Sequence, residues 1–391
     1  MEINFGVKII TISFLAQFAT FSCVVASILY LIFAVRCVSR FTATQDSITS
    51  KFCPPVTLLK PICGLDPDLY ENLRSFCEQE YPYYQIIFGV SDPLDLSVPI
   101  IQRLLKEFSD LDLSLVIDDR VHGINPKINN LINMYQQSKY DWIIIADSDI
   151  RVDSNYLKSI VAPFENNKIG AVTCLYLCFP IKGIASRLST LFINGWFLPS
   201  VLIANAIQKI RYCFGPTMAI RRDVLEQMGG FNKLLSVLAD DYLLGKLTFD
   251  LGYQVHLSSY LVKNIVEEPN FKRLFLHELR WARTIYSVQP IGHTFSVIVH
   301  AIPVSLLFLA VAPSYMLGLT VVSIAITIRL LMHLFIYRNL ELEIRSSDIL
   351  LIPLRDLLTF IVWSVSFFGR SIQWRQHNFL VKANSQLVIK D

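Results

Sequence analysis

The sequence predicts a mainly parallel α/β domain between transmembrane helices, and two observations support this fold class. First, 53% of the 391 residues are hydrophobic and the mean hydropathy is +0.46, which is too apolar for an ordinary soluble protein of this length. Second, uncharged runs at residues 9–35 and 284–328 enclose a charged region in which apolar strand-like segments alternate with helix-like segments. Alternation of this kind is typical of βαβ units.

The apolar runs predict a multi-pass membrane protein, because about 20 apolar residues cross a bilayer. Residues 7–36 are expected to form a retained anchor, since this run is too long for the core of a signal peptide. Residues 291–370 are expected to contain two or three helices. The last of these would include Arg355 and Asp356, which must pair or lie near an interface.

The charges suggest the side of the membrane and exclude some partners. Four positive residues follow the anchor: Arg36, Arg40, Lys51 and Lys60. The positive-inside rule then places the middle of the chain in the cytoplasm. The net charge of +3 comes without any basic run, so nucleic acid is not an expected partner. Neither a Gly-x-Gly-x-x-Gly nor a P-loop motif occurs, which weakens a dehydrogenase or NTPase interpretation.

After a linker at residues 37–54, strands and helices are expected to alternate through a domain at 55–290. The expected strands are 56–60, 85–91, 113–117, 142–146 and 170–177, and the expected helices are 69–80, 98–108, 126–138 and 155–164. In sheets of this type, ligands bind at the carboxyl ends of the strands. Asp92 and Asp147 both follow a strand and therefore occupy that edge. Residues 371–391 are expected to be a tail.

Residues 183–208 are almost as apolar as the membrane runs, with Arg187 as their only charge. A crossing here would separate Asp147 and Asp149 from Asp240 and Asp241 on opposite sides of the membrane. We therefore expect a helix lying in the membrane interface, while a buried core helix remains an alternative.

The triplet Asp147-Ser148-Asp149 directly follows the buried strand at 142–146. Neighbouring carboxylates repel each other unless they stay hydrated or share a cation, and oxygen ligands suit Mg²⁺ or Mn²⁺. This pattern predicts a divalent cation that carries a diphosphate. A solvated turn would have the same sequence.

Two further stretches combine charge with a helix start. Asn125 is a typical N-cap residue and Pro126 is typical of the first helical position, so a helix is expected to begin beside Lys127. The free backbone amides there, together with the lysine, could bind an anion. Alternatively, this is an ordinary capped helix on the surface. Asp240 and Asp241 begin another helical pattern. One of these two aspartates could act as a general base. Alternatively, both could simply stabilise the N-terminus of the helix.

The stretch His277-Glu278-Leu279-Arg280-Trp281 precedes the second membrane run. It is not a zinc metalloprotease signature, because Trp281 replaces the second histidine. Arg280 beside Trp281 suits a phosphate contact with an apolar platform. An anchor at the membrane interface would look similar.

Taken in order, these signals resemble a known series. Asp92, Asp147-Ser148-Asp149, Asp241 and the final Arg280-Trp281 are similar to the D, D, D, (Q/R)xxRW series of inverting family-2-like glycosyltransferases. The match to the ceramide glucosyltransferase family (family 21) is carried by further stretches: Lys60-Pro61, Gly64-Leu65-Asp66-Pro67, Gly123-Ile124-Asn125-Pro126-Lys127-Ile128-Asn129-Asn130-Leu131, and Arg222-Asp223-Val224-Leu225 followed by Gly229-Gly230. The bacterial hopanoid-associated branch is also similar, in the complete acidic triplet, in Cys174-Leu175-Tyr176 and in the stretch His277-Glu278-Leu279-Arg280-Trp281-Ala282-Arg283-Thr284.

The resemblance implies a GT-A (Rossmann-like) domain and a role for each matched residue. Asp92 would hold uridine, and Asp147 and Asp149 would bind ribose and the metal-diphosphate, with Asp149 as the likelier metal ligand. The anion site expected at Lys127 would then belong to the binding of the nucleotide sugar. Asp241 would be the base, Arg280 would stabilise the departing UDP, and Trp281 would line the sugar and acceptor site. His277 departs from the Gln or Arg of the family motif and receives no role.

The implied activity is inverting transfer of glucose from UDP-glucose to ceramide or a similar lipid, with Mn²⁺ or Mg²⁺. The alternative within the family is transfer of N-acetylglucosamine from UDP-GlcNAc to a hopanoid. An alternative of another class is a non-catalytic membrane scaffold. Such a scaffold has no need of four acidic positions in this order.

Overall fold

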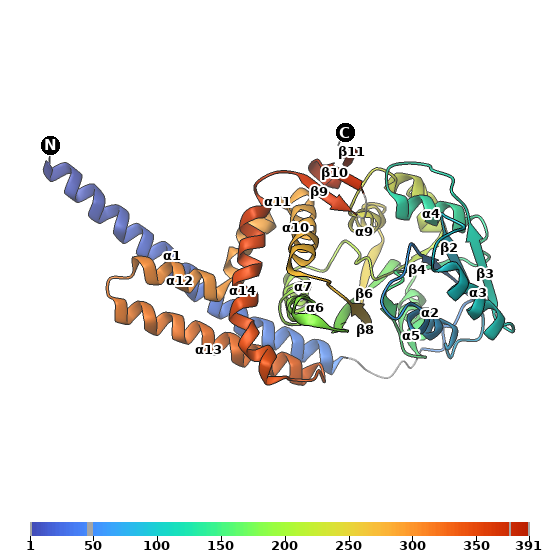
Figure 1. Ribbon diagram of the computed structural model, residues 1–391, viewed down its shortest axis with the longest axis horizontal. Helices are drawn as coiled ribbons and strands as arrows, with labels where there is room; N and C mark the ends of the chain where they lie inside the picture. Colours follow the sequence, from blue (N-terminus) through green and yellow to red (C-terminus); the bar gives the residue numbers. More distant parts are fainter. Residues whose placement is uncertain (1, 45–49, 375–376, 390–391) are drawn as a thin grey trace. The chain divides into compact units, whose positions relative to one another are not determined.

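The computed structural model describes residues 2–44, 50–374 and 377–389, and the chain divides into two compact units (Figure 1). The sheet unit contains Thr44–Ile193, Ile207–Leu274 and Arg370–Asp391, and the helical unit contains Met1–Ala43, Asn194–Ala206 and Phe275–Gly369. Helix α1 (Glu2–Ala43) continues past residue 36, where the linker was expected to begin, because Cys37 and Val38 are buried. Residues 45–49 of that linker lie outside the described residues.

The first half of the sheet unit has the predicted βαβ arrangement. Four parallel strands lie in the order β3-β2-β1-β4. Their bounds are β1 (Val56–Pro61), β2 (Tyr84–Val90), β3 (Asp112–Ile117) and β4 (Trp142–Ala146), and the connecting helices are α2 (Leu69–Cys77), α3 (Val98–Glu107) and α4 (Pro126–Tyr135). Strand β2 is buried along its whole length, as expected for a strand covered on both faces.

The second half of the eight-stranded sheet is mixed. Strand β7 (Thr217–Arg221) is antiparallel to both β4 and β6 (Ile169–Pro180), and the long strand β8 (Gln254–Val266) runs parallel to β6. The short β5 (Ile150–Arg151) pairs antiparallel with β8. We did not predict β7 and β8, because neither is a continuous apolar run. Helices α5 (Tyr156–Val161), α6 (Gly183–Phe192), α8 (Arg222–Gln227) and α9 (Asp240–Asp250) complete this half.

Close packing sets the position of α4 on the sheet. A Cβ atom at Gly89 would lie 2.2 Å from the sulfur of Met134, so only glycine lets α4 approach β2 this closely. The Asn130 side chain donates a hydrogen bond of 2.7 Å to the Gly89 carbonyl oxygen. Asn130 and Met134 therefore hold α4 closely against β2.

The expected tail at 371–391 is instead folded. Strands β9 (Ser371–Trp374), β10 (His377–Val381) and β11 (Leu387–Ile389) form an antiparallel sheet, in the order β11-β10-β9, within the sheet unit. Ile372, Phe379 and Leu387 are buried in a small hydrophobic cluster that also contains Leu238. We missed the strands because each is only three to five residues long.

The helical unit supplies the membrane-compatible segments. Four helices among the described residues are long and apolar enough to cross a bilayer: Ser13–Ala43, Gly183–Ile207, Tyr315–Asn339 and Ser346–Ser366. The segment Gly183–Ile207 consists of α6, a π-helical stretch and α7 (Leu198–Ile207), and it spans the boundary of the two units. A further pair, Pro290–Val299 and Ala301–Val311, passes the same test only together and is bent by 71°.

Two buried ion pairs join the last helix, α14 (Ser346–Ser366), to earlier helices. The Arg355 guanidinium donates two hydrogen bonds of 2.7 Å to the Glu278 carboxylate on α10 (Phe271–Val288). Asp356 accepts bonds of 2.9 and 3.0 Å from Arg329 on α13 (Tyr315–Asn339). All four side chains are at most 4% exposed. Of the two expected alternatives, pairing or a place near an interface, the structure shows pairing for both Arg355 and Asp356.

The chain returns to the sheet unit after the helical stretch Phe275–Gly369, and this return limits how often the stretch can cross the membrane. If the sheet unit lies on one side of the membrane, this stretch makes an even number of crossings. We predict that α13 and α14 cross as a hairpin and that the bent pair at 290–311 enters and leaves on the same side. The same reasoning predicts that Gly183–Ile207 does not cross, since the sheet unit lies on both sides of it in sequence.

This prediction can be checked with cysteine reporters read by a membrane-impermeant reagent in sealed vesicles. Reporters in the linker at 45–49 and after Asp391 are expected to be labelled from the same side, whereas a reporter before Met1 should be labelled from the other side. Labelling of the linker and the C-terminus from opposite sides would contradict the even number of crossings.

Candidate active site

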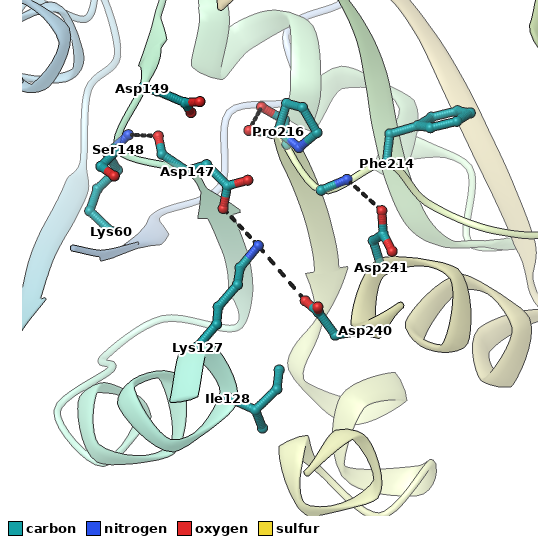
Figure 2. Close-up of polar contacts among 12 residues, drawn as sticks. Lys60, Lys127, Ile128, Asp147, Ser148, Asp149, Phe214, Pro216, Asp240 and Asp241 are labelled. Atoms are coloured by element: carbon teal, nitrogen blue, oxygen red, sulfur yellow. Dashed lines mark hydrogen bonds and ion pairs between the residues drawn. The ribbon is translucent and has the colours of Figure 1, made fainter. Parts of the chain in front are cut away.

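The acidic triplet begins where β4 ends, and a buried lysine holds its backbone. Lys60, at the end of β1, is fully buried, and its Nζ donates a hydrogen bond of 2.5 Å to the carbonyl oxygen of Asp147 (Figure 2). The same ammonium lies 3.8 Å from the centroid of the Phe76 ring. Burial lowers the pKa of Lys60 to about 7, although Asp147 and Asp149 oppose this shift. Lys60 therefore fixes the turn that presents both carboxylates.

Asp149 lies close to other acidic side chains. Its Oδ2 accepts a hydrogen bond of 2.7 Å from the side-chain amide of Asn264 on β8. The neighbouring Ser148 hydroxyl donates to the carboxylate of Asp66. Burial, together with the nearby Asp147 and Asp66, raises the pKa of Asp149 to about 7. The free energy of such a cluster is lowered by any cation that binds between the carboxylates.

The donor set fits a divalent cation that completes its coordination with ligands from a substrate. Within the described residues, no group of three or more His, Cys, Asp or Glu side chains forms a full metal cage. Mg²⁺ and Mn²⁺ accept oxygen ligands, and Mg²⁺ is usually bound through one or two carboxylates plus phosphate oxygens and water. Asp147 and Asp149 provide that partial set at the edge of the sheet.

Lys127 links the triplet to the second acidic pair. Asn125 caps α4 as predicted, since its side chain accepts a hydrogen bond of 3.2 Å from the amide of Ile128. The Nζ of Lys127 lies 2.6 Å from Asp147 Oδ1 and 3.8 Å from Asp240 Oδ2 (Figure 2). Burial lowers the pKa of Lys127, but attraction to these two carboxylates outweighs burial and raises it overall.

Asp240 and Asp241 are the first residues of α9. Asp241 accepts hydrogen bonds from two backbone amides, Gly215 at 2.9 Å and Tyr242 at 2.7 Å. Burial, reinforced by repulsion from Asp240, raises the pKa of Asp241 to about 7. Burial also raises the pKa of Asp240, whereas Lys127 acts in the opposite direction. A buried carboxylate with a raised pKa is suited to accept a proton near neutral pH.

Gly215 shows how closely these groups meet. A Cβ atom at this residue would lie 3.5 Å from Asp241 Oδ2, 3.6 Å from Asp147 Oδ2 and 4.0 Å from Lys127 Nζ. One point in space is therefore within van der Waals contact of both acidic turns and the lysine. The lack of a side chain at Gly215 keeps that point open.

The remaining predicted residues lie elsewhere. Asp92 follows β2 at the same edge of the sheet as Asp147, is exposed, and accepts a hydrogen bond of 2.8 Å from the amide of Leu94. Arg280 and Trp281 lie on α10 in the helical unit, where the rings of His277 and Trp281 are 4.2 Å apart between centroids. The structure thus gathers Asp147, Asp149, Lys127 and Asp241 in one unit, and Arg280 with Trp281 in the other.

Four residues that contact the acidic groups of this site, or the backbone that presents them, were given no role from the sequence. Lys60 had a signal, since it is the only charge in the buried strand Val56–Pro61, and Asp66 lay in a matched stretch. Asn264 and Gly215 had no recognisable signal. Asn264 lies in β8, which we did not predict, and Gly215 acts through its backbone amide.

Comparisons with known proteins identify the family of this chain. The model of glycosyl transferase family 21 matches residues 19–387. Ceramide glucosyltransferase 3 of Caenorhabditis elegans is 23% identical over 355 residues, covering 86% of this chain and 74% of the relative. The ceramide glucosyltransferase of Candida albicans is 37% identical over 124 residues, which is 29% of this chain and 23% of the relative.

A solved structure has a similar fold. A mannosyltransferase from Pyrobaculum calidifontis, in complex with GDP-Man and Mn²⁺, has a TM-score of 0.54 at 16% identity and covers 92% of this chain and 98% of its own. This likeness confirms the expected GT-A fold. The family model covers nearly the whole chain and agrees with the resemblance found in the sequence. The chain therefore belongs to glycosyl transferase family 21, the family of the ceramide glucosyltransferases.

Proposed function

We propose that this protein transfers glucose from UDP-glucose to the hydroxyl group of ceramide or a similar lipid, with inversion at the anomeric carbon. The observation that carries the proposal is the meeting of two acidic turns around Lys127, with Asp147 on one side and Asp240 and Asp241 on the other. One turn suits a metal-bound diphosphate, and the other offers a base. Family membership and the names of the curated relatives favour glucose and ceramide.

The nucleotide sugar would be held by residues at the carboxyl edge of the sheet. Asp92 would contact the uridine, and Asp147 the ribose and the diphosphate. Asp147 and Asp149 would hold a Mn²⁺ or Mg²⁺ ion, which supplies positive charge beside the diphosphate when bound. Lys127 already faces Asp147 at 2.6 Å, so its ammonium is placed to neutralise a phosphate oxygen in the same region.

In the chemical step, Asp241 would take the proton from the lipid hydroxyl as that oxygen attacks the anomeric carbon. The bond between this carbon and the diphosphate oxygen breaks, and UDP leaves with the electron pair. Arg280 would stabilise the negative charge on UDP, and Trp281 would line the sugar and acceptor site. A single displacement inverts the anomeric configuration without a covalent intermediate.

The membrane would supply the acceptor. The apolar helices of the helical unit suit integral membrane insertion, and the sheet unit would face the cytoplasm. Arg36, Arg40 and Lys51 support that orientation. Lys60 does not contribute to it, because its ammonium is buried at Asp147.

The activity can be tested directly in membranes that contain the full chain. With labelled UDP-glucose, ceramide and Mn²⁺ or Mg²⁺, we expect a labelled lipid that is absent from control membranes. Parallel reactions with UDP-GlcNAc and a hopanoid acceptor would identify the other branch of the family. If no sugar, acceptor and cation combination gives a labelled lipid, the protein is better described as a non-catalytic scaffold.

Asp241→Asn tests the base. We expect transfer to fall by about 100-fold to 10,000-fold, which is the typical contribution of general base catalysis, while UDP binding is retained. The measurement is the rate of lipid glucosylation together with UDP affinity by titration. Equal loss of transfer and of UDP binding would show that Asp241 holds the nucleotide and is not a base.

The wild-type pH profile gives a second check on this assignment. Since burial and Asp240 raise the pKa of Asp241 to about 7, the ionised base is lost as the pH falls through that value. The transfer rate should therefore decrease from pH 8 to pH 6. A rate that is constant across this range would contradict the assignment.

Asp149→Ala tests the metal assignment. We expect the part of the UDP affinity that depends on Mn²⁺ to disappear, because Asp149 is the proposed main metal ligand. UDP titration with and without Mn²⁺ measures this difference, and Asp153→Ala, an exposed carboxylate four residues away in the chain, is a control expected to behave as wild type. A Mn²⁺ effect of unchanged size in Asp149→Ala would show that the metal has other ligands.

A further inference from the structure

The C-terminal sheet β9–β11 contacts the chain directly before the second acidic pair. Its strands follow the last helix of the helical unit, but they belong to the same compact unit as Asp240 and Asp241. Figure 1 shows these strands beside α9. The sequence between 236 and 239 therefore meets residues that lie about 150 positions later in the chain.

Backbone hydrogen bonds define this contact. The amide of Leu387 donates to the carbonyl of Ser236 at 2.8 Å, and the amide of Leu238 donates to the carbonyl of Ser385 at 2.9 Å. The amide of Ala239 donates to the hydroxyl oxygen of Ser385 at 3.2 Å. Ala239 is the N-cap residue of α9 and has no side-chain cap of its own, so Ser385 supplies an acceptor from a distant part of the chain.

Apolar packing supports the same contact. Leu238 is buried in one cluster with residues from all three C-terminal strands: Ile372, Phe379, Val381 and Leu387. Two residues before Asp240, the chain is thus anchored by both hydrogen bonds and a small core.

The backbone at Ser385 is held in an unusual conformation. Its φ is 55°, in the left-handed region that favours glycine, and Asn384 beside it has a φ of 56°. Ser385 is only 1% exposed, whereas Asn384 is exposed. Such strain persists where surrounding contacts impose it, often at functional sites. Here it lets one residue offer both its carbonyl and its hydroxyl oxygen to Leu238 and Ala239.

The opposite side of this segment is held by the helix that carries Lys127. The amide of Asn125 donates to the carbonyl of Leu235 at 2.9 Å, and its side chain donates to the carbonyl of Val237 at 2.8 Å. The segment before Asp240 is therefore clamped between the start of α4 and the C-terminal sheet.

We propose that Ser385 is a positioning residue for Asp241: the C-terminal sheet fixes the start of α9 and so orients the carboxylate that accepts the proton. The proposal rests on the proposed function of Asp241 as the base. Ser385 does not contact the reacting groups. It acts through Ala239 and the first turn of α9.

Two substitutions separate positioning from general stability. Ser385→Ala removes the hydroxyl acceptor, and Ser385→Gly removes it while also relieving the left-handed backbone. We expect both to lower kcat by roughly fivefold to tenfold, the effect of one hydrogen bond, with little change in KM for UDP-glucose. The pH dependence of kcat should shift as well, because the surroundings of Asp241 change. Ser385→Gly should unfold at a temperature no lower than Ser385→Ala.

The matched control is Asn384→Gly, which relieves the same backbone strain at the adjacent exposed residue without touching Ala239. It should retain wild-type kcat and pH dependence. Wild-type kcat and pH dependence in Ser385→Gly would overturn the proposal, as would an equal loss in Asn384→Gly. Asp241→Asn in the same assay distinguishes failure of the base assignment from failure of the positioning role. If transfer survives Asp241→Asn, Asp241 is not the base. If transfer is lost in Asp241→Asn while the Ser385 variants are fully active, only the positioning role of Ser385 is refuted.

Discussion

The interaction on which the candidate site depends is the ammonium group of Lys127 between two acidic turns. Asp147 and Asp240 come from distant parts of the sequence, and their carboxylates would repel each other at this separation without a cation between them. A buried charge costs several kcal/mol unless it is paired. Lys127 offsets that cost on both sides, and it is placed there by the Asn125 cap and by the close contact of α4 with Gly89.

A second lysine does a different task in the same site. Lys60 binds a backbone carbonyl and not a carboxylate, so it fixes the shape of the turn without occupying a carboxylate oxygen of Asp147 or Asp149. The two lysines thus have different roles, one in the backbone conformation of the site and the other in its charge balance. One holds the turn after β4, and the other compensates the groups that this turn presents.

Much of this arrangement could be predicted from local sequence. The strand Trp142–Ala146 is continuous and apolar, and the Asn125 cap has a clear signature, so both were placed within a residue. Strands β7 and β8 were missed because their neighbours in the sheet, rather than their own periodicity, make them strands. The contact of Ser385 with Ala239 joins residues 146 positions apart and has no local signal at all. Order along the chain identified the family, but packing decided which side chains meet.

The paired charges of α14 bear on how the protein is assembled. Arg355 and Asp356 would each cost roughly 2.5–3.5 kcal/mol at the centre of a helix that enters the bilayer alone. Their partners, Glu278 and Arg329, are synthesised earlier, on α10 and α13. Helix α14 is therefore inserted at low cost only when those two helices are already in place to receive it. Among the described helices, α14 follows both helices that carry its partners, so the order of synthesis favours the order of assembly.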